Sequence, residues 1–390
     1  MHHLAQKDPV YLSVSQYMLK GLTDRGEIKE SESCVKCHVP VGVVTGYPQK
    51  TSDDTAKIPE LAMEGIQCDY CHSATGAQKL FNNDLKLSPG NGEDDPGIKR
   101  GPRKDAASDY HATEFSAFHT DSAICGTCHN VKHVAFGTNL ETTYDEWLKS
   151  PYNTKNPDTR VTCQGCHMYQ RPGMAATGST KRPTNPGVSA EDGLFRDHVF
   201  THYFVGANTF VPDSVKDETK AGMARARLQN AATLSLDASQ KKEAGRLVVK
   251  ISNTGAGHYL PTGLIDVRQM WLEVTVTDPD QKVVFAAGKP DKNGWLPKET
   301  TVYNTVFGDG QGNPIVNIAK AREILKDNRI PPLKSAYETI LLPDQTRKTL
   351  TVNVKLQYRG APQKLIDQVN GQGKLKLPVV TMAEIEKQVF

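Results

Sequence analysis

The sequence of 390 residues predicts two structural units of different kinds. For residues 1–212 it predicts short helices and loops with little regular secondary structure, and for 233–390 an antiparallel β-sandwich, joined by a helical linker over 213–232. The first region holds all eight cysteines and all but one of the twelve histidines. In the second, apolar and polar residues alternate as they do in half-buried strands. The length also exceeds what a single core usually accommodates.

The first region is rich in turn-forming residues, for example over 90–97 and 171–187. One short helix is predicted over 143–149, where Tyr144, Trp147 and Leu148 share a face before Pro151 stops it. The region offers few residues for a conventional core. We therefore expect bound groups to supply much of its apolar interior.

The second region begins after a helix predicted over 213–229, in which apolar residues recur at helical spacing. Strands are expected over 246–251, 271–277, 282–285 and 350–356, with a hairpin turn over 278–281. Short helices are expected over 362–369 and 382–389. Alternating strands with few helices favour an antiparallel sandwich.

Every cysteine belongs to a Cys-x-x-Cys-His motif, and none is left over. This spacing suits c-type haem, because two thioethers anchor the haem vinyl groups while the following imidazole reaches the iron. A zinc site or a redox pair can contain one such motif, but four without a spare cysteine argue strongly against both. The sequence therefore predicts four c-type haems. The attachment residues are Cys34, Cys37, Cys68, Cys71, Cys125, Cys128, Cys163 and Cys166, and the proximal iron ligands are His38, His72, His129 and His167.

The sixth ligand of each iron decides between an electron carrier and an enzyme, because a second histidine closes the iron to substrate. Eight histidines remain for four irons. We expect His119, His133, His202 and His258 to be distal ligands, with His198 and His111 as further candidates. The alternative for each is a solvated or hydrogen-bonded side chain.

His2 and His3 lie at the extreme N-terminus, where chains usually fray. They are either a solvated tail or tag remnant, or ligands that reach a haem in another subunit.

Composition excludes several classes of function. The net charge is +3, without the long basic run of a nucleic-acid-binding protein. No stretch approaches the 18 consecutive apolar residues of a transmembrane helix. The N-terminus lacks the apolar segment of a signal peptide. Since haem is attached covalently outside the cytoplasm, we interpret the numbering as that of a processed, secreted chain.

The motif segments 65–72, 125–131 and 161–168, with 255–263 and 327–332 in the second region, resemble extracellular multihaem cytochromes of metal-reducing and related anaerobic prokaryotes. The resemblance covers most of the chain. It implies electron transport, since some members polymerise into filaments with a continuous haem stack, where an N-terminal histidine can complete a neighbour's haem. One departure is Ser150-Pro151-Tyr152, where many relatives have a histidine.

Four hypotheses follow. The first is an electron conduit at the cell surface or outside the cell, a head-to-tail homopolymer (nanowire) that serves anaerobic respiration and passes electrons to redox proteins or extracellular acceptors. The second is a soluble periplasmic tetrahaem shuttle. The third is a multihaem nitrogen-compound oxidoreductase, which would need an open iron. In the fourth, aromatic residues of the β region such as Trp271, Trp295 and Tyr303 bind a surface ligand, although Trp271 favours a core role.

Overall fold

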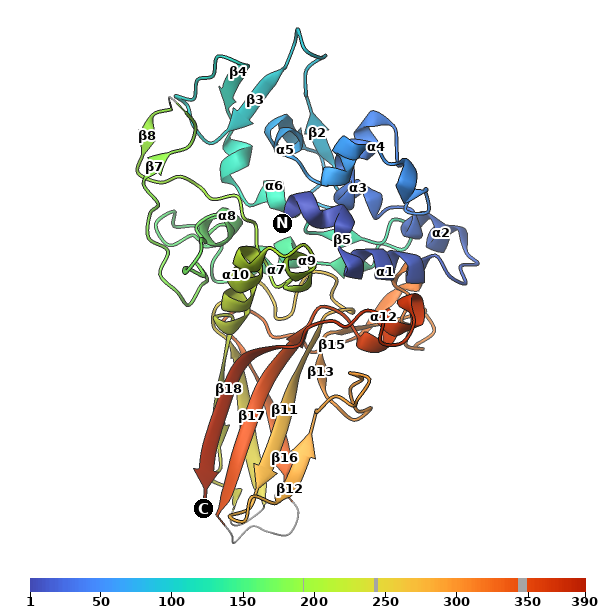
Figure 1. Cartoon of the computed structure of the whole chain (residues 1–390), viewed down its shortest axis with the longest axis vertical. Helices are drawn as coiled ribbons and strands as arrows, with labels where there is room; N and C mark the ends of the chain where they lie inside the picture. Colours follow the sequence, from blue (N-terminus) through green and yellow to red (C-terminus); the bar gives the residue numbers. More distant parts are fainter. Residues whose placement is uncertain (192, 242–244, 343–348) are drawn as a thin grey trace. The chain divides into compact units, whose positions relative to one another are not determined.

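The computed structural model describes residues 1–191, 193–241, 245–342 and 349–390 (Figure 1). The chain forms two compact units, each built from separate stretches of sequence. The first unit contains residues 1–171, 182–206 and 306–325, and the second contains 172–181, 207–305 and 326–390. Among the described residues, no helix is both long and apolar enough to cross a bilayer.

The first unit consists of short helices and two-stranded ribbons. Its helical elements are η1 (His2–Lys7), α1 (Pro9–Met18), α2 (Arg25–Ser31), α3 (Val35–His38), α4 (Pro40–Thr45), η2 (Thr55–Lys57), η3 (Glu60–Glu64), α5 (Cys68–His72), η4 (Ala117–Thr120), α6 (Ala123–Gly126), α7 (Thr143–Leu148), α8 (Cys163–His167) and η5 (Ile318–Lys320). Its ribbons pair β1 (Ala74–Ala77) with β2 (Leu85–Leu87), β3 (Ile98–Gly101) with β4 (Ala112–Phe115), β5 (Val131–Lys132) with β6 (Asn139–Glu141), and β7 (Gly187–Val188) with β8 (Phe195–Arg196).

Local sequence explains where the first helices begin. The Asp8 carboxylate accepts a hydrogen bond from the Val10 amide, and Pro9 fills the first turn of α1. At α2, Asp24 and Glu27 form a reciprocal capping box. These caps therefore fix where the two helices begin.

The segment 306–325 belongs to the first unit, although its sequence lies within the predicted β region. Asn317 explains how it is held, because its side-chain amide donates to the carbonyls of Met18 and Lys20. The chain enters and leaves this segment through β14 (Thr305–Gly308) and β15 (Glu323–Asp327), which pair with each other.

The second unit contains two antiparallel sheets. One has the strand order β16 (Ser335–Leu341), β10 (Arg246–Asn253), β9 (Ala232–Asp237), and the other has the order β12 (Val283–Ala287), β11 (Gln269–Thr277), β17 (Leu350–Arg359), β18 (Val380–Val389), with β13 (Val302–Tyr303) also paired to β11 (Figure 1). The long pairing of β11 with β17 runs from Gln269 opposite Arg359 to Thr277 opposite Thr351. The predicted strands over 246–251, 271–277, 282–285 and 350–356 are therefore confirmed, with small changes at their ends.

One hydrophobic cluster joins the two sheets of the second unit. Leu247, Val249 and Ile251 of β10 are fully buried in it, together with Val352 and Val354 of β17. The two sheets of the second unit therefore share one apolar core. Trp271 and Tyr303 are buried as well, which leaves neither ring available as a surface binding platform.

The helices of the second unit depart from expectation at two places. The helix predicted over 213–229 is split into α9 (Phe210–Ser214) and α10 (Glu218–Gln229), because Asp217 caps a new helix start. The helix predicted over 382–389 is wrong: this segment is part of β18 and pairs along the length of β17. The predicted helices at 143–149 and 362–369 are present as α7 and as α12 (Gln363–Asn370).

Candidate haem-binding site

Each Cys-x-x-Cys-His motif lies on a short helical turn of the first unit. Three motifs coincide with α3, α5 and α8, and the third begins in α6 and continues as a turn in which the amides of Cys128 and His129 donate to the Cys125 carbonyl. In a helix, positions i, i+3 and i+4 share one face. The two thiols and the imidazole of each motif can therefore meet the same ligand.

Three of the motif histidines have a defined partner at Nδ1. His38 donates to the Ala5 carbonyl at 3.0 Å, His72 donates to the Arg100 carbonyl at 2.6 Å, and Nδ1 of His129 lies 3.2 Å from the Glu141 carboxylate. Partners of this kind place the proton on Nδ1, so that Nε2 carries the lone pair with which an imidazole binds a metal. The donor set therefore fits haem iron.

The third motif lies between the first and the fourth. The thiols of Cys37 and Cys128 lie close enough to shift each other's pKa, and so do those of Cys125 and Cys163. The thiol of Cys71, in the second motif, is close enough to Cys128 to raise its own pKa, although burial is the larger cause. The four attachment points are thus clustered, with the third in contact with two others.

Two histidine pairs have the spacing of two axial ligands. Imidazoles that bind one metal ion from opposite sides, each through a bond of about 2 Å, have ring centres about 6 Å apart. The ring centres of His2 and His129 are 6.2 Å apart, and those of His72 and His202 are 6.4 Å apart. His202 donates Nδ1–H to the Phe200 carbonyl, which leaves its Nε2 for a metal. These two pairs are the best candidates for iron coordination.

His2 contacts the third motif of its own chain rather than extending into solvent. Burial, and then the neighbouring His129, lower the pKa of His2 to about 3. Gly65 makes the approach possible, since a Cβ there would lie 2.7 Å from the His2 carbonyl oxygen. This placement offers an alternative to the predicted role of His2 in another subunit, whereas His3 is exposed.

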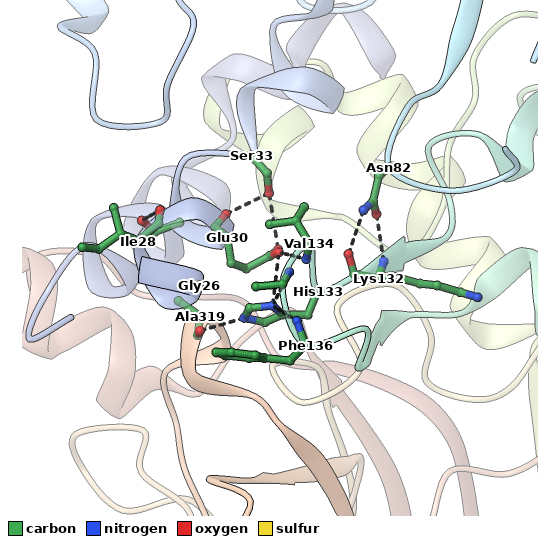
Figure 2. Close-up of polar contacts among 12 residues, drawn as sticks. Gly26, Ile28, Glu30, Ser33, Asn82, Lys132, His133, Val134, Phe136 and Ala319 are labelled. Atoms are coloured by element: carbon green, nitrogen blue, oxygen red, sulfur yellow. Dashed lines mark hydrogen bonds and ion pairs between the residues drawn. The ribbon is translucent and has the colours of Figure 1, made fainter. Parts of the chain in front are cut away.

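His133, expected to be a distal ligand, has both ring nitrogens occupied by protein groups (Figure 2). Nε2 donates to the Ala319 carbonyl at 2.8 Å, while Nδ1 accepts from the amides of Ala135 and Phe136. The buried Glu30 carboxylate lies 3.8 Å from Nδ1, and burial raises its pKa. This arrangement argues against His133 as an iron ligand, because neither nitrogen has a free lone pair.

His119 also lies beside His72, with ring centres 5.6 Å apart, but its Nε2 hydrogen-bonds to the Cys71 carbonyl. Its buried Nδ1 has no hydrogen-bond partner. At His198, Nδ1 accepts from the Asn185 amide, which places the proton on Nε2 and disfavours ligation through that atom. His202 is therefore the better partner for His72.

Two more candidates are bonded to nearby backbone. His111 donates Nδ1–H to the Ala112 carbonyl, and His258, in the second unit, donates to the Tyr259 carbonyl. Nothing further tests their predicted roles as distal ligands, which stay predictions.

Glu141 is a site residue that the sequence reasoning missed. Burial alone would lower the pKa of His129, but the hydrogen bond and the charge of Glu141, together with the nearby Cys128 and Cys163, raise that pKa to about 9. Glu141 is the last residue of β6, the returning strand of the short β5–β6 ribbon that begins two residues after His129. No separate sequence signal marks this carboxylate.

Clustered Cys-x-x-Cys-His helices are typical of multihaem c-type cytochromes, and comparisons show what this chain is similar to. Residues 5–73 match the family described as cytochrome c554 and c-prime. The fold resembles that of a penta-haem cytochrome c552 from Thermochromatium tepidum, with a TM-score of 0.63 at 19% identity over 100% of this chain and 94% of that one. A search of curated proteins found no match.

Proposed function

We propose that the chain carries four c-type haems, one on each motif, and moves electrons between them outside the cytoplasm. The clustering of the four motifs carries this proposal, because the third contacts the first and the fourth through its cysteines. Haems attached so close together favour transfer from one to the next. The protein's part is to hold each iron between two imidazoles, which suits electron transfer without a bound substrate.

In this proposal His129 and His2 would hold one iron, and His72 and His202 would hold another. Both pairs lie within the first unit, and both have ring-centre separations suited to a shared iron. For the other two irons the predicted distal ligands His119, His111 and His258 stay proposals, while the Asn185 amide at Nδ1 disfavours His198.

The haem number is tested by intact mass and by haem absorbance of the protein matured in a secretion-competent host. The expected result is four haems per chain, and a loss of one in each variant in which both cysteines of a motif become alanine. A chain with fewer haems, or with zinc at a motif, would overturn the proposal.

More specifically, we propose that the chain is a subunit of an extracellular filament, in which electrons pass along the haems of successive copies. Its support is the resemblance to filament-forming cytochromes. One observation favours a soluble shuttle instead: His2 lies beside a haem site of its own chain, which removes one reason to expect ligation between subunits. Electron microscopy of native cell-surface material separates the two, since filaments support the conduit and dispersed particles support the shuttle.

Gly65→Ala should weaken the His2–His129 pair. Gly65 has a φ of +63°, and an added Cβ would meet the His2 carbonyl, so we expect a loss of about 1–3 kcal/mol of stability and displacement of the N-terminal segment. Carbon monoxide binding to the reduced holoprotein should rise. The control is Gly21→Ala, where φ is +64° but no atom lies within 4 Å. Equal carbon monoxide binding in both variants would contradict this prediction.

A further inference from the structure

The motif histidines differ in the group that accepts their Nδ1 proton. For His38 and His72 this group is a neutral backbone carbonyl, but for His129 it is the carboxylate of Glu141. A negatively charged acceptor draws the Nδ1 proton away from the ring and raises the basicity of Nε2. Among these three motif histidines, His129 therefore has the most anionic character.

Glu141 is held in this position by the surrounding chain. In the β5–β6 ribbon its backbone pairs with Val131, two residues after His129. The Thr143 hydroxyl donates to the same carboxylate oxygen at 3.4 Å, and the Tyr144 amide donates to the His129 carbonyl at 3.1 Å. The Glu141 side chain is 16% exposed. The carboxylate is thus fixed and largely shielded from water, which strengthens its effect on the imidazole.

A more basic axial imidazole stabilises iron(III) relative to iron(II), and hydrogen bonding to an axial ligand is one of the ways in which a protein sets a haem potential. The iron concerned belongs to the third motif, which lies between the first and the fourth. Any change in its potential alters how readily an electron passes through the middle of the cluster.

We propose that Glu141 lowers the reduction potential of the haem on Cys125, Cys128 and His129. The potential of this haem would then lie below the value it would have with a neutral partner at His129, which changes how readily it accepts an electron from its neighbours. This inference rests on the proposed function, since it needs a haem at that motif. In each transfer one electron leaves an iron(II) haem, which becomes iron(III), and reduces a neighbouring iron(III) haem to iron(II). No other reactant is required.

The test is a spectroelectrochemical titration of holoprotein carrying Glu141→Gln, with haems distinguished by paramagnetic NMR. Glutamine keeps the size of the side chain but removes its charge. We expect the reduced-to-oxidised equilibrium constant of one haem to rise about tenfold, the lower end for loss of a group that orients a metal ligand. For one electron this is a rise of about 59 mV. Haem number and spin state should not change.

The matched control is Asp145→Asn. Asp145 is a carboxylate near the same motif, but it is bonded to the Asn130 side chain rather than to a ligand imidazole. Its removal should shift the potential of this haem much less. As a second variant, Glu141→Asp keeps the charge on a shorter side chain and should give a smaller rise in the same direction.

An unchanged potential in Glu141→Gln, or an equal shift in Asp145→Asn, would overturn the role of Glu141. These outcomes differ from a failure of the proposed function. If the unsubstituted chain holds no haem at Cys125 and Cys128, the haem assignment itself is wrong. If it holds four low-spin haems and the potential does not respond to Glu141, only the tuning role is lost.

Discussion

Replacing His2 by alanine should leave one of the four haem irons without its sixth ligand. The ring centres of His2 and His129 are 6.2 Å apart, and an alanine at position 2 cannot coordinate iron. We expect one haem in four to become high-spin and to bind carbon monoxide when reduced, while the other three remain low-spin. Electron paramagnetic resonance and carbon monoxide titration measure both effects.

His3→Ala is the matched control for this prediction. His3 is the next residue along the chain but is exposed, so its loss should leave all four haems low-spin. His2→Met should restore six-coordination and raise the potential of that haem, because a Met/His pair has a higher potential than two histidines. If the His2→Ala effect disappeared in dilute monomer, ligation would occur between chains. An unchanged spectrum would rule out His2 as a ligand.

Trp271→Ala should cause the largest loss of stability in the second unit. The ring is fully buried in β11, its indole N–H donates to the Gly288 carbonyl at 2.8 Å, and the Arg359 guanidinium lies 5.5 Å from its centre. Truncating a buried tryptophan costs about 3–5 kcal/mol. Urea unfolding of the holoprotein, followed by far-ultraviolet circular dichroism, measures this loss.

Trp295→Ala provides the comparison for Trp271. Trp295 is only partly buried and donates to the Asp367 carboxylate at 2.8 Å. Its removal should therefore cost clearly less than that of Trp271. Equal costs for the two variants would mean that Trp271 does not occupy the core position described here.

Covalent spacing and strand periodicity could be predicted from the sequence because both are local. The Cys-x-x-Cys-His motifs lie on helical turns as their spacing requires, and the alternation over 246–251 and 350–356 corresponds to β10 and β17. A helix is predicted over 382–389 because Ala383, Glu384 and Lys387 are good helix formers. Pairing with β17 overrides that local preference in β18.

The pairing of histidines could not be predicted because it depends on the tertiary structure. His2 and His129 are distant in sequence, and a glycine at position 65 allows them to approach. His133 follows a motif closely, as a ligand might, yet the carbonyl of Ala319, 186 residues away, occupies its Nε2. No pattern in the sequence marks Glu141 as a partner of His129, since its position follows from the β5–β6 ribbon that brings it back to this histidine.

The most direct test of the central claim is carbon monoxide titration of the reduced, fully haem-loaded chain. If every iron is held between two histidines for electron transfer, the Soret spectrum should not change when carbon monoxide is added. Formation of a carbon monoxide adduct in the unsubstituted protein would reveal an open iron, and would contradict a chain that only transfers electrons.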